Sequence, residues 1–280
     1  MLARICMTLQ PAEICWAVSD SNDPRVKIEF VKEENLGLKY RPSYNISPGE
    51  IVPIIISSQH FDADNFFYTI HPALWGFIPR WHKGIYNEHG FNTTNFSSEK
   101  MNVSRMYKPA FLKGQRCVLV VEGYYEHKRV PYNLPVKERP IYYIYAKQQK
   151  GVKIFDKSTW NYRDINLLYI AGIFDIWTDD TGEEILSFTM LSMDSENDVL
   201  SWLHPRRPVI LESAYQIYRW LNFNEIEEMR AMQLIKHPNV NSIEWHKVSD
   251  CVLNASNKDS KCNKPIETIK YEHKSDDNED

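Results

Sequence analysis

The sequence lacks the signatures of the common nucleotide-dependent and hydrolytic enzymes. Only 10 of the 280 residues are glycine, and no two glycines lie one residue apart, which excludes the fingerprint of dinucleotide-binding folds. There is no GKS or GKT segment, so a phosphate-binding loop of the Walker type is also excluded. HExxH, GxSxG and HRD are absent, which leaves zinc peptidase, serine hydrolase and kinase chemistry without support.

Cysteine is scarce and shows no paired spacing. The five cysteines are Cys6, Cys15, Cys117, Cys251 and Cys262, and none of them forms a CxxC pair. The odd count and the spacing predict neither a disulfide framework nor a zinc site. The nine histidines are scattered without metal-ligand spacing. We therefore expect reduced thiols, no metal and no cofactor.

Long apolar runs and a strong charge of one sign are missing as well. No stretch approaches the ~18 apolar residues that a membrane span needs. The N-terminal region carries Arg4, Glu13 and Asp20 with no long apolar run between them, which is not the pattern of a signal peptide. We expect an intracellular protein, nuclear or cytoplasmic, that is not secreted and does not bind a membrane. The formal net charge of −4 argues against a partner held by bulk positive charge, but it allows a local basic groove.

Segments of strand length dominate what is present. β-branched and aromatic runs predict strands at 51–56, 74–79, 117–121, 141–145, 167–174 and 185–193. Helices are predicted at 214–221 and from Asn224, as the N-cap, to Pro238. This order predicts an α+β fold built on a curved, mixed or mostly antiparallel, barrel-like sheet with flanking helices. We expect one domain over residues 1–262 and a polar, disordered tail over 263–280.

Six short motifs follow one another along the chain. They are PSYN at 42–45, LWGFIPRW at 74–81, NTTN at 92–95, VLVVEGYYE at 118–126, AGIFDIW at 171–177 and LHPRRPVIL at 203–211. Each is weak alone, but in this order they resemble the motifs of the SRAP (SOS response-associated peptidase) family. The resemblance spans about residues 1–255 and implies the SRAP fold for the domain.

The resemblance implies chemistry on abasic sites in single-stranded DNA. In that family the initiator Met is removed, the amine of an N-terminal Cys attacks the open sugar aldehyde, and the thiol closes a stable thiazolidine; a lyase route is the other outcome. An α-amine with a pKa of about 8 is partly neutral at neutral pH, while a carboxylate and a histidine can move protons. By motif position, the catalytic residues are Glu126, His204 and the amide of Asn95.

DNA binding would rest on basic, aromatic and small polar side chains in the same motifs. By position these are Arg4, Ser43, Asn45, Trp81, Lys83 and Arg206. Arg and Lys contact phosphates, and Trp offers a face on which a base can stack, whereas Trp75 is expected in the core. Each residue also has an ordinary structural explanation, such as a strand-end charge or a turn former. Their joint placement in the motifs favours the functional interpretation.

The chain departs from the family at its N-terminus. The family begins Met-Cys-Gly-Arg, whereas here Leu2 and Ala3 precede Arg4. Leucine has no thiol, so no thiazolidine can close, and a bulky second residue disfavours removal of Met1. Cys6 is near in sequence but does not offer an adjacent amine and thiol, so we expect it to pack in the core.

Three further motif positions differ. The arginine of the family's NxR motif is Ser97, the Met of its HxRMP motif is Arg207, and the Trp after the catalytic Glu is His127. The first change removes a phosphate-binding arginine. The autopeptidase and the abasic-site lyase or crosslinking activities that the resemblance implies are therefore open for this chain.

Three explanations of the N-terminal difference remain open. The chain is a diverged member that binds DNA without crosslinking, or it forms only a reversible imine at the Met1 amine, or its true start is a Met-Cys-Gly that is missing here. A different class of function also stays open, either a modified-base reader without catalysis or an interaction scaffold. We expect a monomer, and the sequence identifies no replication-fork protein as a partner.

Overall fold

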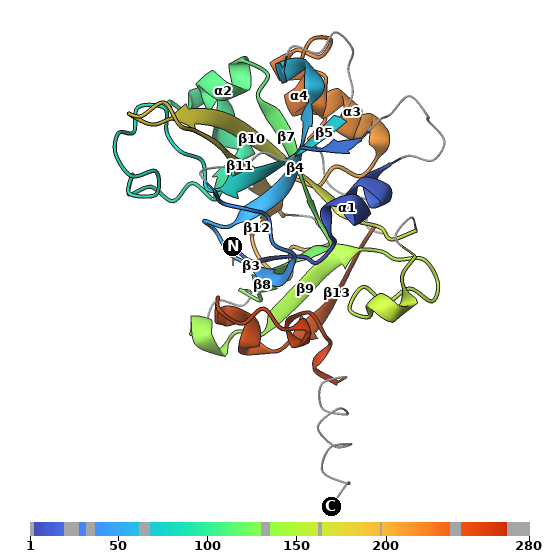
Figure 1. The fold of residues 1–280 in the computed structure, drawn as a ribbon. Helices are drawn as coiled ribbons and strands as arrows, with labels where there is room; N and C mark the ends of the chain where they lie inside the picture. Colours follow the sequence, from blue (N-terminus) through green and yellow to red (C-terminus); the bar gives the residue numbers. More distant parts are fainter. Residues whose placement is uncertain are drawn as a thin grey trace, which may run out of the picture.

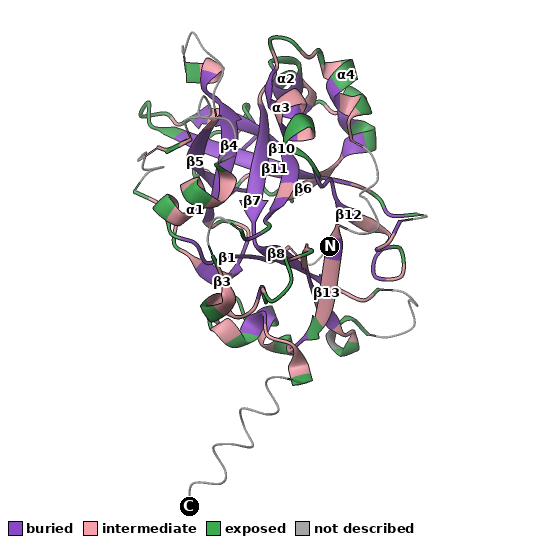
Figure 2. Ribbon diagram, turned by 90° about the vertical axis from the view of Figure 1, so that its right-hand side faces the viewer, coloured by how far each residue is buried: buried purple, intermediate pink, exposed green. Residues whose placement is uncertain are grey.

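The computed structural model describes residues 3–19, 28–31, 37–61, 68–129, 135–161, 164–196, 198–235 and 242–267. Figure 1 shows two bodies of sheet, with the barrel strands in the upper half and a smaller sheet in the lower half. Figure 2 shows that the barrel strands are buried over most of their length, whereas the helices carry the exposed surface. The mixed α+β, barrel-like fold expected from the sequence is confirmed.

Five strands close into a barrel: β4 (Ile51–Ser57), β5 (Tyr68–Trp75), β7 (Arg116–Val121), β10 (Leu168–Thr178) and β11 (Glu184–Asp194). Antiparallel pairs run from β5 through β4, β7 and β10 to β11. A parallel pairing of Ser187 with Leu74 and of Phe188 with Trp75 joins β11 back to β5. Closure matters because it leaves no long row of unpaired main-chain groups on these strands.

Short strands extend the barrel near its rim. β2 (Glu29–Phe30) pairs with β5, while β6 (Asn95–Ser97) and β12 (Arg206–Pro208) both pair with the last residues of β11. β6 and β12 pair with β11 from its two sides, and both pairings include Ser192 (Figure 2). The NTTN and LHPRRPVIL motifs therefore meet at the C-terminal end of one strand.

The second sheet has the strand order β13 (Ile243–Val248), β9 (Ile141–Ala146), β8 (Gly123–His127), β1 (Ile5–Met7) and β3 (Ser43–Ile46). Only Glu122 separates β7 from β8, so the chain passes directly from the barrel into this sheet. A Cβ at Gly123 would lie 2.5 Å from the ring of Tyr143 in the neighbouring strand β9, so only glycine fits at the start of β8.

Within the described ranges, four α-helices flank the sheets: α1 (Pro11–Val18), α2 (Lys108–Leu112), α3 (Ala214–Leu221) and α4 (Glu228–Gln233). The short 3₁₀ turns are η1 (Ser58–Phe61), η2 (Ser98–Val103), η3 (Val136–Glu138), η4 (Lys157–Thr159), η5 (Asp250–Leu253) and η6 (Ser260–Cys262). The helix predicted at 214–221 is confirmed. Its N-terminus is capped by Ser213, whose hydroxyl accepts the N–H of Gln216 at 3.2 Å.

Two predicted boundaries are wrong. The helix expected from Asn224 begins at Glu228, because the main chain at 222–226 forms a separate turn in which the N–H of Ile226 bonds to the carbonyl of Asn222 at 3.0 Å. The strand expected at 74–79 begins earlier, at Tyr68, and ends at Trp75, because Gly76 takes a φ of 141°. Pro238, the expected helix end, lies outside the described residues.

Burial could be compared with the sequence expectations at two further residues, Trp75 and Asn263. Trp75 is completely buried, as expected. Asn263 is also completely buried, and residues 268–280 lie outside the described part, so the tail expected from 263 stays a prediction. Over the ranges given above, no helix has the length and apolar character that crossing a membrane requires.

Candidate functional site

The candidate site lies where β1 meets β8. The two strands are antiparallel, and the N–H of Tyr125 donates to the carbonyl of Arg4 at 3.0 Å. Continued by one residue, this register places Ala3 opposite Glu126. The pairing therefore leads the N-terminal segment along the strand that carries the candidate carboxylate; the two residues before Ala3 lie outside the described part.

Glu126 is shielded from solvent near the C-terminal end of β8. Its side chain is 3% exposed although it lies near the end of β8. One carboxylate oxygen accepts the main-chain N–H of His127 at 3.0 Å, which fixes the orientation of the group. A carboxylate with a fixed orientation next to a chain segment that can carry an amine is placed to transfer protons.

His204 lies in the turn before β12, close to the end of β8. The N–H of Arg129 donates to the carbonyl of Leu203 at 2.7 Å, and this bond ties the turn to the chain that leaves β8. The Nδ1 atom of His204 lies 2.8 Å from the carbonyl of Arg206 and 3.0 Å from its N–H, so the ring orientation is fixed. The structure thus brings the turn of His204 to the C-terminal end of β8, where Glu126 lies.

Burial and nearby positive charge set the protonation state of His204. Burial lowers the pKa of His204 to about 4, and the charges of Arg129 and Arg206 act in the same direction. The imidazole is therefore neutral at pH 7. A neutral imidazole has a free lone pair and can act only as a base, and the lowered pKa makes it a weaker base than an ordinary histidine.

Asn95 is the first residue of β6 and lies opposite Met190 of β11. Its amide donates to the hydroxyl of Thr94 at 3.3 Å, and Trp75 donates its indole N–H to the carbonyl of Thr94 at 2.9 Å. The buried indole thereby holds the NTTN turn against the barrel. Asn95 is half-buried, on the opposite side of β11 from β12.

Arg206 reaches across the end of β11. Its guanidinium contacts both carboxylate oxygens of Glu99, at 3.0 and 2.9 Å, as well as the hydroxyl of Ser97 at 3.0 Å and the carbonyl of Ser192 at 2.8 Å. Partial burial raises the pKa of Glu99, but hydrogen bonds from Arg206 and Ser97 outweigh it and lower the pKa to about 2. The expected phosphate ligand is therefore paired with a carboxylate of this chain, which we call the Glu99–Arg206 pair.

Arg207, which stands where the family has Met, points to the opposite side of β12. Its Nε donates to a carboxylate oxygen of Asp198 at 2.5 Å, and both side chains are 1% exposed. A further N–H donates to the carbonyl of Pro208 at 2.9 Å. This charge is part of the protein interior and not of the candidate binding surface.

Of the other residues expected to contact DNA, three lie in the first two strands of the second sheet or next to them, and two lie in a loop of the barrel. Arg4 is partly buried, and its Nε has no hydrogen-bond partner among the described residues. Ser43 and Asn45 are buried in β3: the hydroxyl of Ser43 accepts the N–H of Asn45 at 3.1 Å, and the Asn45 amide donates to carbonyls of residues 252, 254 and 257. These contacts give Ser43 and Asn45 a structural role, and their contact with DNA stays a prediction.

Trp81 and Lys83 lie in the loop between β5 and β6. Trp81 is 54% exposed, and the ammonium of Lys83 lies 3.5 Å from Asp180 in the turn between β10 and β11. The loop is anchored where the N–H of Ile78 donates to the hydroxyl of Ser187 at 3.0 Å. The anchor residue on β11 is Ser187, whereas Arg206 contacts Ser192 of the same strand. Five residues of strand separate these two positions, which corresponds to about 17 Å. The structure therefore does not place Trp81 and Lys83 at the Arg206 end of β11.

Two arginines near the site were not among the sequence candidates. Arg129 is exposed and Arg139 is half-buried, and their positive charges disfavour protonation of His204 and His127, respectively. The signal was present in the sequence, because Lys128 and Arg129 directly follow the VLVVEGYYEH segment. These residues supply local positive charge in a chain whose net charge is negative.

Cys6 is unsuited to replace the missing nucleophile. It is completely buried, its thiol donates to Glu122 at 3.3 Å, and burial together with the nearby carboxylate raises its pKa well above the ordinary value. A buried thiol that stays protonated is a poor nucleophile. Cys6 therefore packs in the core, as expected.

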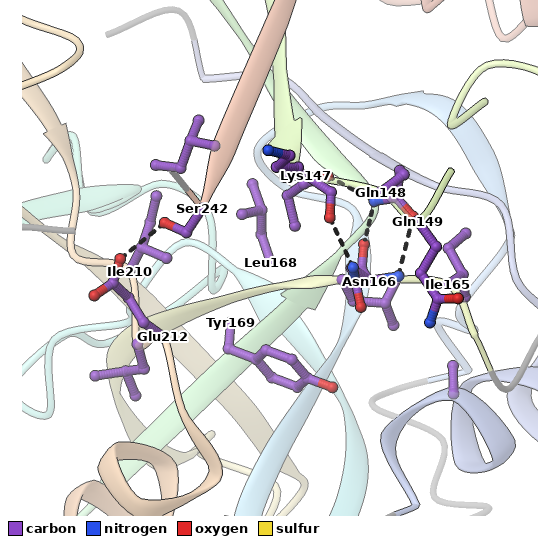
Figure 3. A pocket seen from close by; sticks show the side chains of 15 residues that line it. Lys147, Gln148, Gln149, Ile165, Asn166, Leu168, Tyr169, Ile210, Glu212 and Ser242 are labelled. Atoms are coloured by element: carbon purple, nitrogen blue, oxygen red, sulfur yellow. Dashed lines mark hydrogen bonds between the residues drawn. The ribbon is translucent and has the colours of Figure 1, made fainter. Parts of the chain in front are cut away.

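A separate hollow of about 570 Å³ lies between the barrel and the second sheet, and none of the predicted site residues lines it. Figure 3 shows Ser242 donating to Glu212 on one side of it, while Asn166 and Gln148 bond to main-chain carbonyls on the other. Its polar groups thus bond to one another around the opening. In the described part of the chain, no group of three or more His, Cys, Asp or Glu side chains is placed to hold a metal ion.

The fold and the site define a class of protein: a closed mixed barrel joined to a second sheet, in which the N-terminal strand runs along the strand of a buried carboxylate, and the turn of a buried histidine is tied to the chain that follows this strand. The model of the SOS response associated peptidase (SRAP) family matches residues 1–255. The chain belongs to the SRAP family.

Relatives agree with this assignment. The abasic site processing protein HMCES of Xenopus tropicalis is 36% identical over 235 residues, which are 80% of this chain and 66% of that protein. The protein of the same name from Rattus norvegicus is 35% identical over 245 residues, covering 82% and 67%. An abasic site processing protein of Saccharomyces cerevisiae is 24% identical over 233 residues, covering 81% and 54%. The matched region thus spans about two thirds of the length of the two vertebrate relatives.

Solved structures agree on the fold. A crystal structure of a protein from Bacteroides thetaiotaomicron superposes with a TM-score of 0.68 at 19% identity, covering 94% of this chain and 99% of that one. A protein from Bordetella bronchiseptica gives a TM-score of 0.64 at 15% identity, covering 88% and 99%. At these identities the likeness establishes the fold alone.

Proposed function

We propose that this protein binds single-stranded DNA at abasic sites in the response to DNA damage. The observation that carries the proposal is the register of β1 against β8, which leads the N-terminal segment to Glu126, next to the turn of His204. Membership of the SRAP family and the similarity to abasic site processing proteins support it. Glu126 and His204 are the proposed proton-transfer groups, and the half-buried Asn95 is the proposed orienting amide.

The contacts to DNA are proposed along one line of the surface. Arg4 and Arg129 provide positive charge next to β8, Arg206 does so at the end of β11 in its pair with Glu99, and the exposed Trp81 offers a stacking face on the loop anchored farther along β11. The separation of about 17 Å between the anchors of the Trp81 loop and of Arg206 suits an extended strand and not a single nucleotide. Lys83, which is exposed and close to Asp180, is expected to add little.

We further propose that binding does not lead to a stable crosslink. The position at which the family has its Cys is Leu2, and the nearest other thiol, Cys6, is buried and protonated. An α-amine next to Glu126 and His204 still permits a reversible imine, in which the amine replaces the sugar carbonyl oxygen with loss of water. Glu126 or His204 is then the base that abstracts the sugar proton for strand cleavage.

A gel-shift titration with single-stranded, duplex and abasic single-stranded oligonucleotides tests the binding step. Tighter binding to the single strands and a loss of affinity with rising salt are expected. Trp81→Ala should weaken binding by about tenfold, because base stacking contributes about 1–3 kcal/mol. Lys83→Ala, the matched surface control, should change it by about twofold or less. Equal affinity for duplex and single strand would reject the proposal.

Denaturing gels test the chemistry. After heat and alkali, no adduct should survive, whereas borohydride reduction should trap a small amount of imine. Acetylation of the N-terminus should remove the trapped species. The double substitution Leu2→Cys and Ala3→Gly should produce a stable adduct once Met1 is removed. A stable adduct of the unmodified protein would show that another nucleophile is present. A protein that fails to bind DNA at any salt concentration would favour an interaction scaffold.

A further inference from the structure

Two cysteines lie in contact in the C-terminal part of the domain. Cys251 in η5 and Cys262 in η6 have their sulfur atoms 3.6 Å apart, and both are free thiols. A disulfide bond has a sulfur–sulfur distance of about 2.05 Å, so bond formation requires an approach of about 1.5 Å. The sequence spacing gave no indication of this contact, because eleven positions separate the two residues.

The segment between the two cysteines is held against β3. The amide of Asn45 donates to the carbonyls of Val252, Asn254 and Asn257 at 2.9–3.0 Å. The ammonium of Lys258 donates to the carbonyl of Asn45 at 2.5 Å and to Glu50 at 2.7 Å. Because these bonds fix the course of the segment between the thiols, the sulfur atoms meet in a defined geometry and not by chance motion of a loose loop.

The two thiols differ in accessibility and acidity. Cys251 is half-buried, whereas Cys262 is completely buried. The hydrogen bond between the two thiols lowers the pKa of Cys251 to about 7, against the effect of burial, and raises the pKa of Cys262. A partly exposed thiol with a pKa near ambient pH is the favoured attacking group in disulfide exchange.

We propose that Cys251 and Cys262 form a redox-active pair that closes to an intramolecular disulfide when the protein meets a low-molecular-weight disulfide. The Cys251 thiolate attacks one sulfur of the small disulfide and releases one thiolate, which leaves a mixed disulfide on Cys251. The Cys262 sulfur then attacks the Cys251 sulfur and releases the second thiolate. Two protein thiols are oxidised, the small disulfide is reduced to two thiols, and the two protons pass to the departing thiolates. This inference is independent of DNA binding.

The structural consequence is a clamp at the base of the second sheet. The disulfide would tie η5 to η6 beneath β3, the strand that pairs with β1. A cross-link that closes a loop of this length removes conformational freedom from the unfolded chain. We expect the oxidised protein to melt about 5 °C higher than the reduced protein.

The test exposes the full-length native protein to oxidised glutathione at pH 7.5 and follows the products by intact-mass spectrometry and peptide mapping. The expected product has lost two hydrogen masses and carries a 251–262 linkage. Cys262→Ser should stop at the glutathione mixed disulfide on Cys251, and Cys251→Ser should give neither product. Cys15→Ser is the matched control, because the pKa of half-buried Cys15 is raised by burial, and it should leave the reaction unchanged.

Two outcomes would overturn the proposal. One is a wild-type protein that keeps glutathione on Cys251 without closing the disulfide, and the other is a wild-type protein that does not react at all while the denatured chain does. Both are measured on the unmodified protein, so the conclusion does not depend on whether a variant folds. Alkylation at pH 7 gives a second readout: Cys251 should react about tenfold faster than Cys15.

Discussion

Arg206 and Arg207 are consecutive residues of β12, yet their side chains lie in opposite environments. Because side chains alternate along a strand, one guanidinium points across β11 to the surface and the other points into the interior. Arg206 and Glu99 are 29% and 47% exposed, whereas Arg207 and Asp198 are both 1% exposed. The two ion pairs contain the same functional groups, so their differences follow from burial.

Burial decides whether a pair can exchange its partner. A charge removed from Asp198 would leave Arg207 unpaired in a medium that solvates it poorly, and no ligand can reach it there. Arg206 lies where water or a phosphate can replace Glu99 at modest cost. The comparison indicates that the LHPRRPVIL motif combines a fixed interior ion pair with an exchangeable surface one.

The largest expected effect tests the interior pair. Asp198→Ala should destabilise the protein by about 3–5 kcal/mol, because it leaves a buried guanidinium without its counter-charge. Urea unfolding followed by circular dichroism measures the change. The double variant Asp198→Leu with Arg207→Met, which gives position 207 the family's residue, should recover most of the loss. If the free energy of unfolding of Asp198→Ala equals that of the parent, burial does not distinguish the interior ion pair from the surface pair.

The next effect concerns the surface pair in DNA binding. Arg206→Ala should weaken binding to abasic single-stranded DNA by about tenfold and reduce the slope of log affinity against log salt by about 1, because one phosphate contact is lost. Its unfolding free energy should change by less than about 1 kcal/mol. An unchanged salt slope would mean that Glu99 keeps Arg206 from DNA.

A smaller effect of opposite sign is expected at Glu99. Glu99→Gln removes the carboxylate that competes with phosphate, so single-strand affinity should rise by about fivefold. Glu196→Gln, an exposed carboxylate two residues after the end of β11, is the matched control and should have less effect. Reduced affinity in Glu99→Gln would show that the carboxylate positions Arg206 for DNA and does not compete with it.

The smallest effect concerns pH. The folded-state pKa of Glu99 is lowered to about 2, below its ordinary value, so its contribution to stability is complete above about pH 4.5 and is lost as pH falls through about 2. Between pH 8 and pH 5 the Glu99–Arg206 pair should therefore stay intact, and the affinity gain of Glu99→Gln over the parent should stay constant within about twofold. Fluorescence anisotropy over that range measures it, and a gain that vanishes at pH 5 would contradict the assigned protonation.

His204 gives a second pH dependence with a different window. Its folded-state pKa of about 4 lies below the ordinary histidine value, so the unfolded chain takes up a proton that the folded chain refuses. The parent should lose stability as pH falls from about 6.5 to 4, and His204→Asn should lose less over that interval. Identical pH slopes for both proteins would mean that His204 is not neutral in the fold.

Much of the fold could be predicted because its strands are strongly patterned. The apolar run Cys117–Val121 lies entirely within β7, and 214–221 coincides with α3. The start of α4 could not be predicted, because Asn224 is a good N-cap by type and only the bonds made by residue 222 show that the chain turns there first.

The candidate site was predictable only in part. Motif positions gave Glu126 and His204, which the structure brings to the C-terminal end of β8. The partners of Arg206 and Arg207 were not predictable, since Glu99 and Asp198 are ordinary acidic residues outside the motifs and contact the arginines only after folding. The low pKa of His204 depends in the same way on burial and on arginines brought near it by the chain path.

The parallel contact between β5 and β11 can form only late in the synthesis of the chain. Leu74 and Trp75 acquire their partners Ser187 and Phe188 only after the strands between them have been made. Until then, a chain emerging from the ribosome carries an unpaired edge at the end of β5 near Leu74 and Trp75, which another chain can occupy. Closure through such distant residues is a slow, non-local step. Chains released before β11 is complete should therefore aggregate, and this single contact marks the point at which synthesis yields a protein able to protect its own strands.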